Sequence, residues 1–150
     1  MLFDGPWARR RDRRNLASAF IGEIAAAMES VEEHIGRRLE GAASREAEPP
    51  FDFGDFQLPR LAVYEANVGR LTLFNPPLPR ELSYFYTRLA ALPARLRALK
   101  PSSSSSAEVV KQNSQRALEE VTRTMQLGEN ILHNIKGFVS RKQPDSISRA

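Results

Sequence analysis

The chain has 150 residues, with 22 lysines and arginines against 18 acidic residues, a net charge of +4 and no cysteine. This length fits one domain and is enough to bury a sizeable core. The lack of cysteine excludes thiol catalysis, dithiol redox chemistry and metal sites built on cysteine. No stretch of about 20 apolar residues is present, so the sequence predicts no membrane-spanning helix.

The first 14 residues form a basic stretch. It carries Trp7 and the five arginines Arg9, Arg10, Arg11, Arg13 and Arg14. We expect these side chains to contact an anionic surface, because each basic residue near a lipid headgroup layer adds about 1 kcal/mol of attraction and tryptophan anchors at membrane interfaces. Nucleic-acid phosphates are the competing target. The alternative is a soluble bundle in which basic and acidic faces pair with each other. This would also explain why basic and acidic residues are grouped in different segments of the chain.

The helical domain is expected at residues 15–140. No proline lies between Trp7 and Glu48, and apolar residues recur there at steps of three and four. The stripe is Leu16, Phe20, Ile24, Met28, Val31, Ile35 and Leu39. It predicts a long amphipathic helix with charged residues, Glu23 among them, on the other side. A Pro-, Ala- and Glu-rich loop at 41–58 follows.

Two shorter helices are expected in the middle of the chain. Residues 60–70 predict two to three turns of helix with Leu61, Tyr64, Val68 and Leu71 on one apolar side. Residues 80–100 predict a longer helix whose stripe is Leu82, Phe85, Leu89, Leu92, Leu96 and Leu99. Pro93 lies inside this pattern, so we expect a kink or a short break there.

A serine-rich linker at 101–106 leads into the last helix, and a serine such as Ser106 can cap its start. Apolar residues then follow a heptad, with Gly128 at one seam position. The expected seam is Leu118, Val121, Met125, Leu132, Ile135 and Val139. Residues 141–150 are expected to form a flexible tail.

The fold class is therefore all-α. We expect an elongated antiparallel bundle of two long helices, one proline-kinked helix and one short helix. Packing of the coiled-coil type is expected, either within one chain or between two copies in a homo-oligomer.

A polar set within the short helix is the second candidate site. Tyr64, Asn67 and Arg70 recur at helical spacing on a mostly apolar side. They predict either a buried hydrogen-bond network that fixes one end of the bundle or the lining of a small polar pocket.

Catalytic and cofactor motifs are lacking from the sequence. The two histidines, His34 and His133, belong to no metal-binding motif, and neighbouring glutamates such as Glu119 and Glu120 point about 100° apart on a helix. No phosphate-binding glycine loop or nucleophile elbow occurs. We expect no metal, no cofactor and no enzymatic activity.

A family resemblance rests on Pro59–Leu71, on Pro76-Pro77-Leu78 and on Leu82–Tyr86. These segments, with the basic stretch and Ile21–Ile24, resemble small uncharacterised bacterial membrane-tethered helical proteins over about residues 8–100. Such proteins carry one transmembrane helix before the basic stretch, so this sequence either departs from the family or begins after that helix. The resemblance implies no activity; it implies a location, since basic residues beside a span mark the cytoplasmic side.

The leading hypothesis is thus a non-enzymatic interaction or scaffold module at the cytoplasmic face of a bacterial membrane. Its partners would be an anionic membrane surface, another protein or a second copy. The alternatives are a nucleic-acid-binding helical module and a helical sensor domain with a small-molecule pocket near Tyr64.

Overall fold

The structure is a computed structural model that describes residues 5–36, 56–100 and 102–140. These residues form helices and no strand, which confirms the predicted all-α class. The elements are α1 (Pro6–Val31), a π-helical turn η1 (Glu32–Gly36), α3 (Ala62–Asn67), a 3₁₀ turn η2 (Val68–Leu73), α4 (Leu78–Ala98) and α5 (Ala107–Val139). The predicted stripe residue Leu39, the loop at 41–55 and the tail at 141–150 lie outside the described residues.

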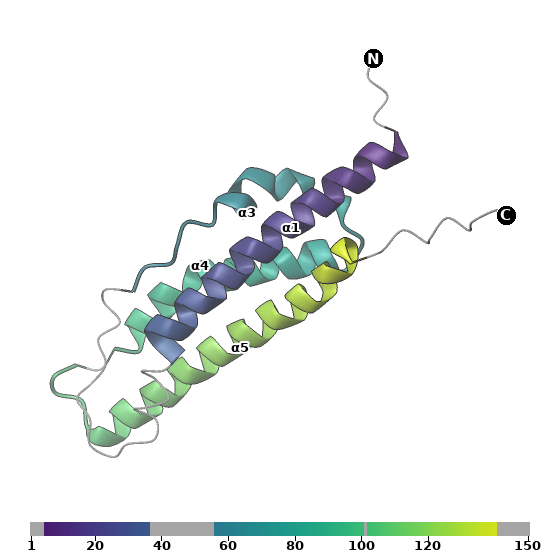
Figure 1. The fold of residues 1–150 in the computed structure, drawn as a ribbon. Helices are drawn as coiled ribbons and strands as arrows, with labels where there is room; N and C mark the ends of the chain where they lie inside the picture. Colours follow the sequence, from purple (N-terminus) through teal and green to yellow (C-terminus); the bar gives the residue numbers. More distant parts are fainter. Residues whose placement is uncertain (1–4, 37–55, 101, 141–150) are drawn as a thin grey trace.

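Three helices form the bundle (Figure 1). α1 and α4 run in the same direction, and α5 returns antiparallel to both. The connection that precedes α4 carries α3 and η2, and α3 lies over α1 and α4 on the side away from α5 (Figure 1). The short helix α3 contacts α1 at Glu23. It therefore lies beside the middle of α1 and not at an end of the bundle, where the sequence placed it.

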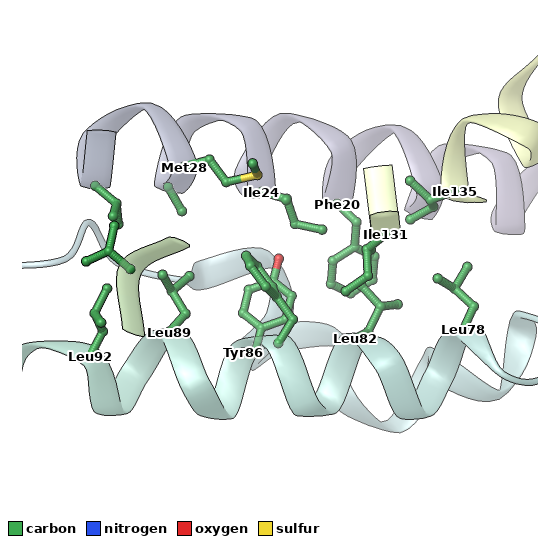
Figure 2. Close-up of a cluster of buried hydrophobic side chains, with 14 of the residues drawn as sticks. Phe20, Ile24, Met28, Leu78, Leu82, Tyr86, Leu89, Leu92, Ile131 and Ile135 are labelled. Carbon is green, nitrogen blue, oxygen red and sulfur yellow. The ribbon is translucent and has the colours of Figure 1, made fainter. Parts of the chain in front are cut away.

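The core is a continuous apolar column between the three helices (Figure 2). The stripe predicted on α1 is buried from Leu16 to Ile35, and Ala17 and Ala27 are buried beside it. The stripe predicted on α4 is also buried from Leu82 to Leu96, and Leu78 and Tyr86 join it. Large apolar residues at steps of three and four were enough to identify both faces, because each helix buries one side only.

Pro93 lies inside α4, which nevertheless runs without a break from Leu78 to Ala98. The predicted short break is thus absent. A proline removes one backbone donor from the helix, but Leu92 and Leu96 on either side of it are buried in the core. Packing of this face holds the last turns of α4 in helical conformation.

The buried face of α5 matches the predicted heptad at Val121, Gly128 and Ile135 and differs from it elsewhere. The buried residues are Ser114, Ala117, Val121, Thr124, Gly128, Ile131 and Ile135. Leu118, Met125, Leu132 and Val139 are only half-buried on the flank of this face. Small and hydroxyl-bearing residues thus occupy the centre of the buried face. The hydroxyls can be buried because each donates to a carbonyl of the preceding turn, Ser114 to Val110 at 2.7 Å and Thr124 to Glu120 at 2.8 Å.

The predicted helix at 60–70 is divided between α3 and η2. Leu71 is buried as expected, whereas Val68 is 50% exposed and does not share the apolar side. At the start of α5, Ser106 is the predicted cap, and its Oγ accepts a hydrogen bond from the Val109 N–H. In the described parts of the chain, none of the helices is long and apolar enough to cross a bilayer.

Candidate functional site

The basic stretch is part of α1, which begins at Pro6 and therefore before the domain boundary expected at residue 15. Proline suits the first helical position, because a backbone N–H group there would have no hydrogen-bond partner within the helix. Gly5 precedes it, and the Gly5 carbonyl accepts the Ala8 N–H at 3.0 Å. The first turn has no side-chain cap and no acidic residue, although acidic residues are the ones that a helix N-terminus favours. Arginines occupy this end instead.

Two of the five arginines continue the core-facing side of α1. Arg9, Arg13, Leu16 and Phe20 follow one another at steps of four, three and four, so they share one side of the helix. Arg9, Arg10 and Arg13 line an open groove of about 420 Å³ together with Pro6, Thr72 and Leu73. The side of α1 that carries apolar residues inside the bundle thus carries arginines near the N-terminus of the helix.

Two of these guanidinium groups lie over aromatic rings. Arg13 lies 5.2 Å from the centroid of Phe138, and Arg10 lies 5.6 Å from the centroid of Trp7. Phe138 in turn packs edge-on against Phe74 with ring centroids 5.5 Å apart. Cation–π contacts of this kind favour the charged group over the ring face. The core's aromatic cluster therefore orients Arg13 at the groove.

The three groove arginines also form no ion pair within the described residues, although Asp12 lies nearby on α1. None of the ion pairs recorded there involves Arg9, Arg10 or Arg13. Two arginines elsewhere in the bundle are paired: Glu120 binds both Arg88, at 3.1 Å, and Arg95, at 2.8 Å. With five arginines and one acid between Pro6 and Arg14, the basic end presents a net positive field.

The other candidates for anionic contact do not line the groove. Arg11 and Arg14 are exposed and lie on other sides of α1 than Arg13, since successive residues are 100° apart. Trp7 is 74% exposed. The structure therefore divides the six predicted contact residues into a groove set of Arg9, Arg10 and Arg13 and an outer set of Trp7, Arg11 and Arg14.

The second predicted set, Tyr64, Asn67 and Arg70, is only partly brought together. Asn67 donates from its amide to the Val63 carbonyl at 2.8 Å and accepts from Arg70 at 3.1 Å. Arg70 is exposed, so this pair is a local surface contact and not a buried network. Tyr64 instead stacks on Tyr86 of α4, with ring centroids 4.1 Å apart and an interplanar angle of 8°.

A partly buried polar network does exist, and it is centred on Glu23. The carboxylate accepts the backbone N–H groups of Val63 at 2.6 Å and Tyr64 at 3.0 Å, and the Tyr86 hydroxyl at 2.8 Å. Burial, followed by the hydrogen bond to Glu23 and its negative charge, raises the pKa of Tyr86 above its ordinary value. Tyr86 therefore stays a donor, and α1 supplies the cap that α3 lacks. The placement of Glu23 on the solvent side of α1 was wrong.

The remaining polar candidates have structural surroundings. Glu119 lies 4.0 Å from Arg123 on the exposed side of α5, while Glu120 turns toward α4, so the two glutamates do not face each other. His34 is exposed, and its Nδ1 lies 2.8 Å from the Ser30 carbonyl. His133 is exposed on α5. Among the residues that the structure describes, no three acidic or histidine side chains gather as a metal site would require.

The groove at the N-terminal end of α1 is therefore the feature that a function has to explain. No protein-family model matches the chain, and no curated protein and no solved structure is significantly similar to it.

Proposed function

We propose that this protein is a non-enzymatic helical interaction module that binds an anionic membrane surface through the N-terminal end of α1. The observation that carries the proposal is the concentration of five arginines on the first three turns of one helix, three of them around an open groove. Five basic residues near an anionic bilayer supply about 5 kcal/mol of attraction. This is of the order needed for reversible membrane binding.

Trp7 supports a membrane rather than a nucleic acid as the anionic surface. The indole is 74% exposed beside the arginines, and an amphipathic aromatic ring is most favourable at the headgroup level of a bilayer. An exposed tryptophan next to a basic cluster has no such apolar layer to enter on duplex DNA, whose phosphates attract charge alone.

The cytoplasmic face of a bacterial membrane is the location we propose. Its support is the resemblance of Pro59–Leu71 and the basic stretch to membrane-tethered bacterial proteins, in which the positive residues mark that side. Anionic lipids give the cytoplasmic leaflet its negative surface potential. Membrane fractionation of cells that express the chain, with and without the five arginines, tests this location.

The direct experiment uses Trp7, which is the single tryptophan of the chain. Phosphatidylcholine vesicles with and without phosphatidylserine are titrated into the protein, and tryptophan emission and co-sedimentation are followed. We expect a blue shift and sedimentation with the anionic vesicles only, and weaker binding as salt is raised. Replacing all five arginines by glutamine should abolish both signals.

A variant with the same net charge provides the control. Arg80, Arg97, Lys111, Arg116 and Arg123 are exposed on α4 and α5, and their replacement by glutamine removes five positive charges away from the groove. This variant should keep most of the vesicle binding. If both variants lose binding equally, attraction is a property of net charge and the proposed site is wrong. Salt-sensitive retention on random DNA without vesicle binding would favour a nucleic-acid-binding module instead.

A further inference from the structure

The groove set differs from a flat basic patch, because all three arginines line one open volume. The rest of the lining is polar Thr72 and apolar Pro6 and Leu73. The groove's volume of about 420 Å³ falls within the range of about 300–1,000 Å³ that is typical of small-molecule sites. This combination fits a compact polyanionic group attached to an apolar stem.

We propose that the groove binds a phosphomonoester group. This inference rests on the proposed function and deepens it, because it names the headgroup chemistry that the module selects. A phosphomonoester carries a charge of about −1.5 to −2 at pH 7 and three terminal oxygens. Carboxylates and phosphodiesters carry a single negative charge and therefore balance less of the field of three guanidinium groups.

Guanidinium groups suit this ligand in geometry as well as in charge. The planar arginine side chain donates two parallel hydrogen bonds to two oxygens of one phosphate. Two of the three groups are already placed by aromatic rings, Arg13 by Phe138 and Arg10 by Trp7. Side chains held in this way lose less freedom when a ligand binds. Thr72 adds a hydroxyl that can donate to a remaining oxygen.

Two sources can provide a phosphomonoester, namely a lipid such as phosphatidic acid and a free metabolite. The first arm of the test compares phosphatidylcholine vesicles that contain either phosphatidic acid or phosphatidylserine, matched in zeta potential. The groove predicts tighter binding to phosphatidic acid, by about ten-fold or more for a set of charge-assisted hydrogen bonds. The second arm measures thermal stabilisation of the protein by sn-glycerol 3-phosphate, with glycerol as the control.

Two double variants separate the groove from general charge, because each removes two arginines from α1. In Arg9→Gln/Arg13→Gln the groove set is lost, and the preference for phosphatidic acid over phosphatidylserine should fall to about one. In Arg11→Gln/Arg14→Gln only exposed charges are lost, so both affinities should fall together and the preference should remain. Circular dichroism melting of each variant shows that the helices are retained.

The outcomes divide as follows. Stabilisation by glycerol phosphate that the Arg9→Gln/Arg13→Gln variant lacks supports the groove with a soluble ligand, and a preference seen on vesicles alone supports it with a lipid. Equal binding to the two charge-matched vesicles, without any effect of glycerol phosphate, overturns the groove while leaving the membrane proposal intact. An equal loss of preference in both double variants also overturns it. Failure of the wild-type protein to bind any anionic vesicle overturns the proposed membrane function itself.

Discussion

Gly128 lies in the buried face of α5, where this helix packs against α1 and α4. A Cβ atom at this position would lie 2.6 Å from Met28 Sδ and 2.9 Å from Phe85 Cε2. The thioether of Met28 is flexible, but the Phe85 ring is fully buried and has no space to enter. Overpacking a core costs about 1–3 kcal/mol, whereas replacing a helix-interior glycine by alanine gains about 0.8–1.0 kcal/mol. Gly128→Ala should therefore be destabilising by up to about 2 kcal/mol.

Gly22 provides the matched control, since it lies in the interior of α1 and a Cβ there would meet nothing within 4 Å. Gly22→Ala should stabilise the protein by about 0.4–1 kcal/mol. Urea unfolding followed by circular dichroism measures both variants, and the difference between them isolates the packing cost. If Gly128→Ala stabilised the protein as much as Gly22→Ala does, α5 would not pass this close to Met28 and Phe85, and the helix packing described above would be wrong.

Three further predictions concern polar groups. Glu23→Gln should lower the unfolding free energy by about 1–3 kcal/mol, because it places an amide among three hydrogen-bond donors. The control Glu29→Gln, on the exposed side of α1, should change the unfolding free energy by less than about 0.5 kcal/mol. Urea unfolding compares the two variants. Because burial and Glu23 raise the pKa of Tyr86, the folded chain keeps a proton that the unfolded chain loses, so the contribution of Tyr86 to stability should be complete below a pH of about 10 and fall above it. Tyr86→Phe should reduce this alkaline loss in thermal melts, and an unchanged loss would show that another group causes it. Ser106→Ala removes the cap of α5 and should cost about 1 kcal/mol; the same change at exposed Ser103, measured in parallel, should cost nothing detectable.

The core faces of α1 and α4 could be predicted because large apolar residues mark them at helical spacing. The face of α5 could be predicted only in part: Val121, Gly128 and Ile135 are buried at predicted seam positions, but Ser114 and Thr124 on the same face carry no apolar signal. The burial of small residues depends on neighbours from other helices: Phe85 and Met28 lie beside Gly128. A search for large apolar residues therefore selects the flank residues Leu118 and Met125 instead.

The candidate sites show the same division between local and long-range information. The arginine cluster is local in sequence and was predictable as a basic end. Its groove was not, because Thr72 and Leu73 arrive from a turn about 60 residues later. Glu23 was assigned to the solvent side because a lone carboxylate on a helix is usually solvated. Its partners, Val63, Tyr64 and Tyr86, come from two other elements, and only tertiary structure brings them together.

The N-termini of the three long helices differ in the charge of their first turns. α5 begins with the Ser106 cap and Glu108 in its first turn, and α4 begins with a proline and Glu81. Both follow the rules that stabilise a helix start. α1 also begins with a proline, but it has no acid in its first turn, and Arg9 and Arg10 lie near its positive end, where each like charge costs about 0.3–1 kcal/mol at low salt. This departure from the first turns of α4 and α5 supports the proposal that the basic end binds an anion. An anion in the groove would remove this repulsion, so its binding and the stability of the first turns of α1 are coupled.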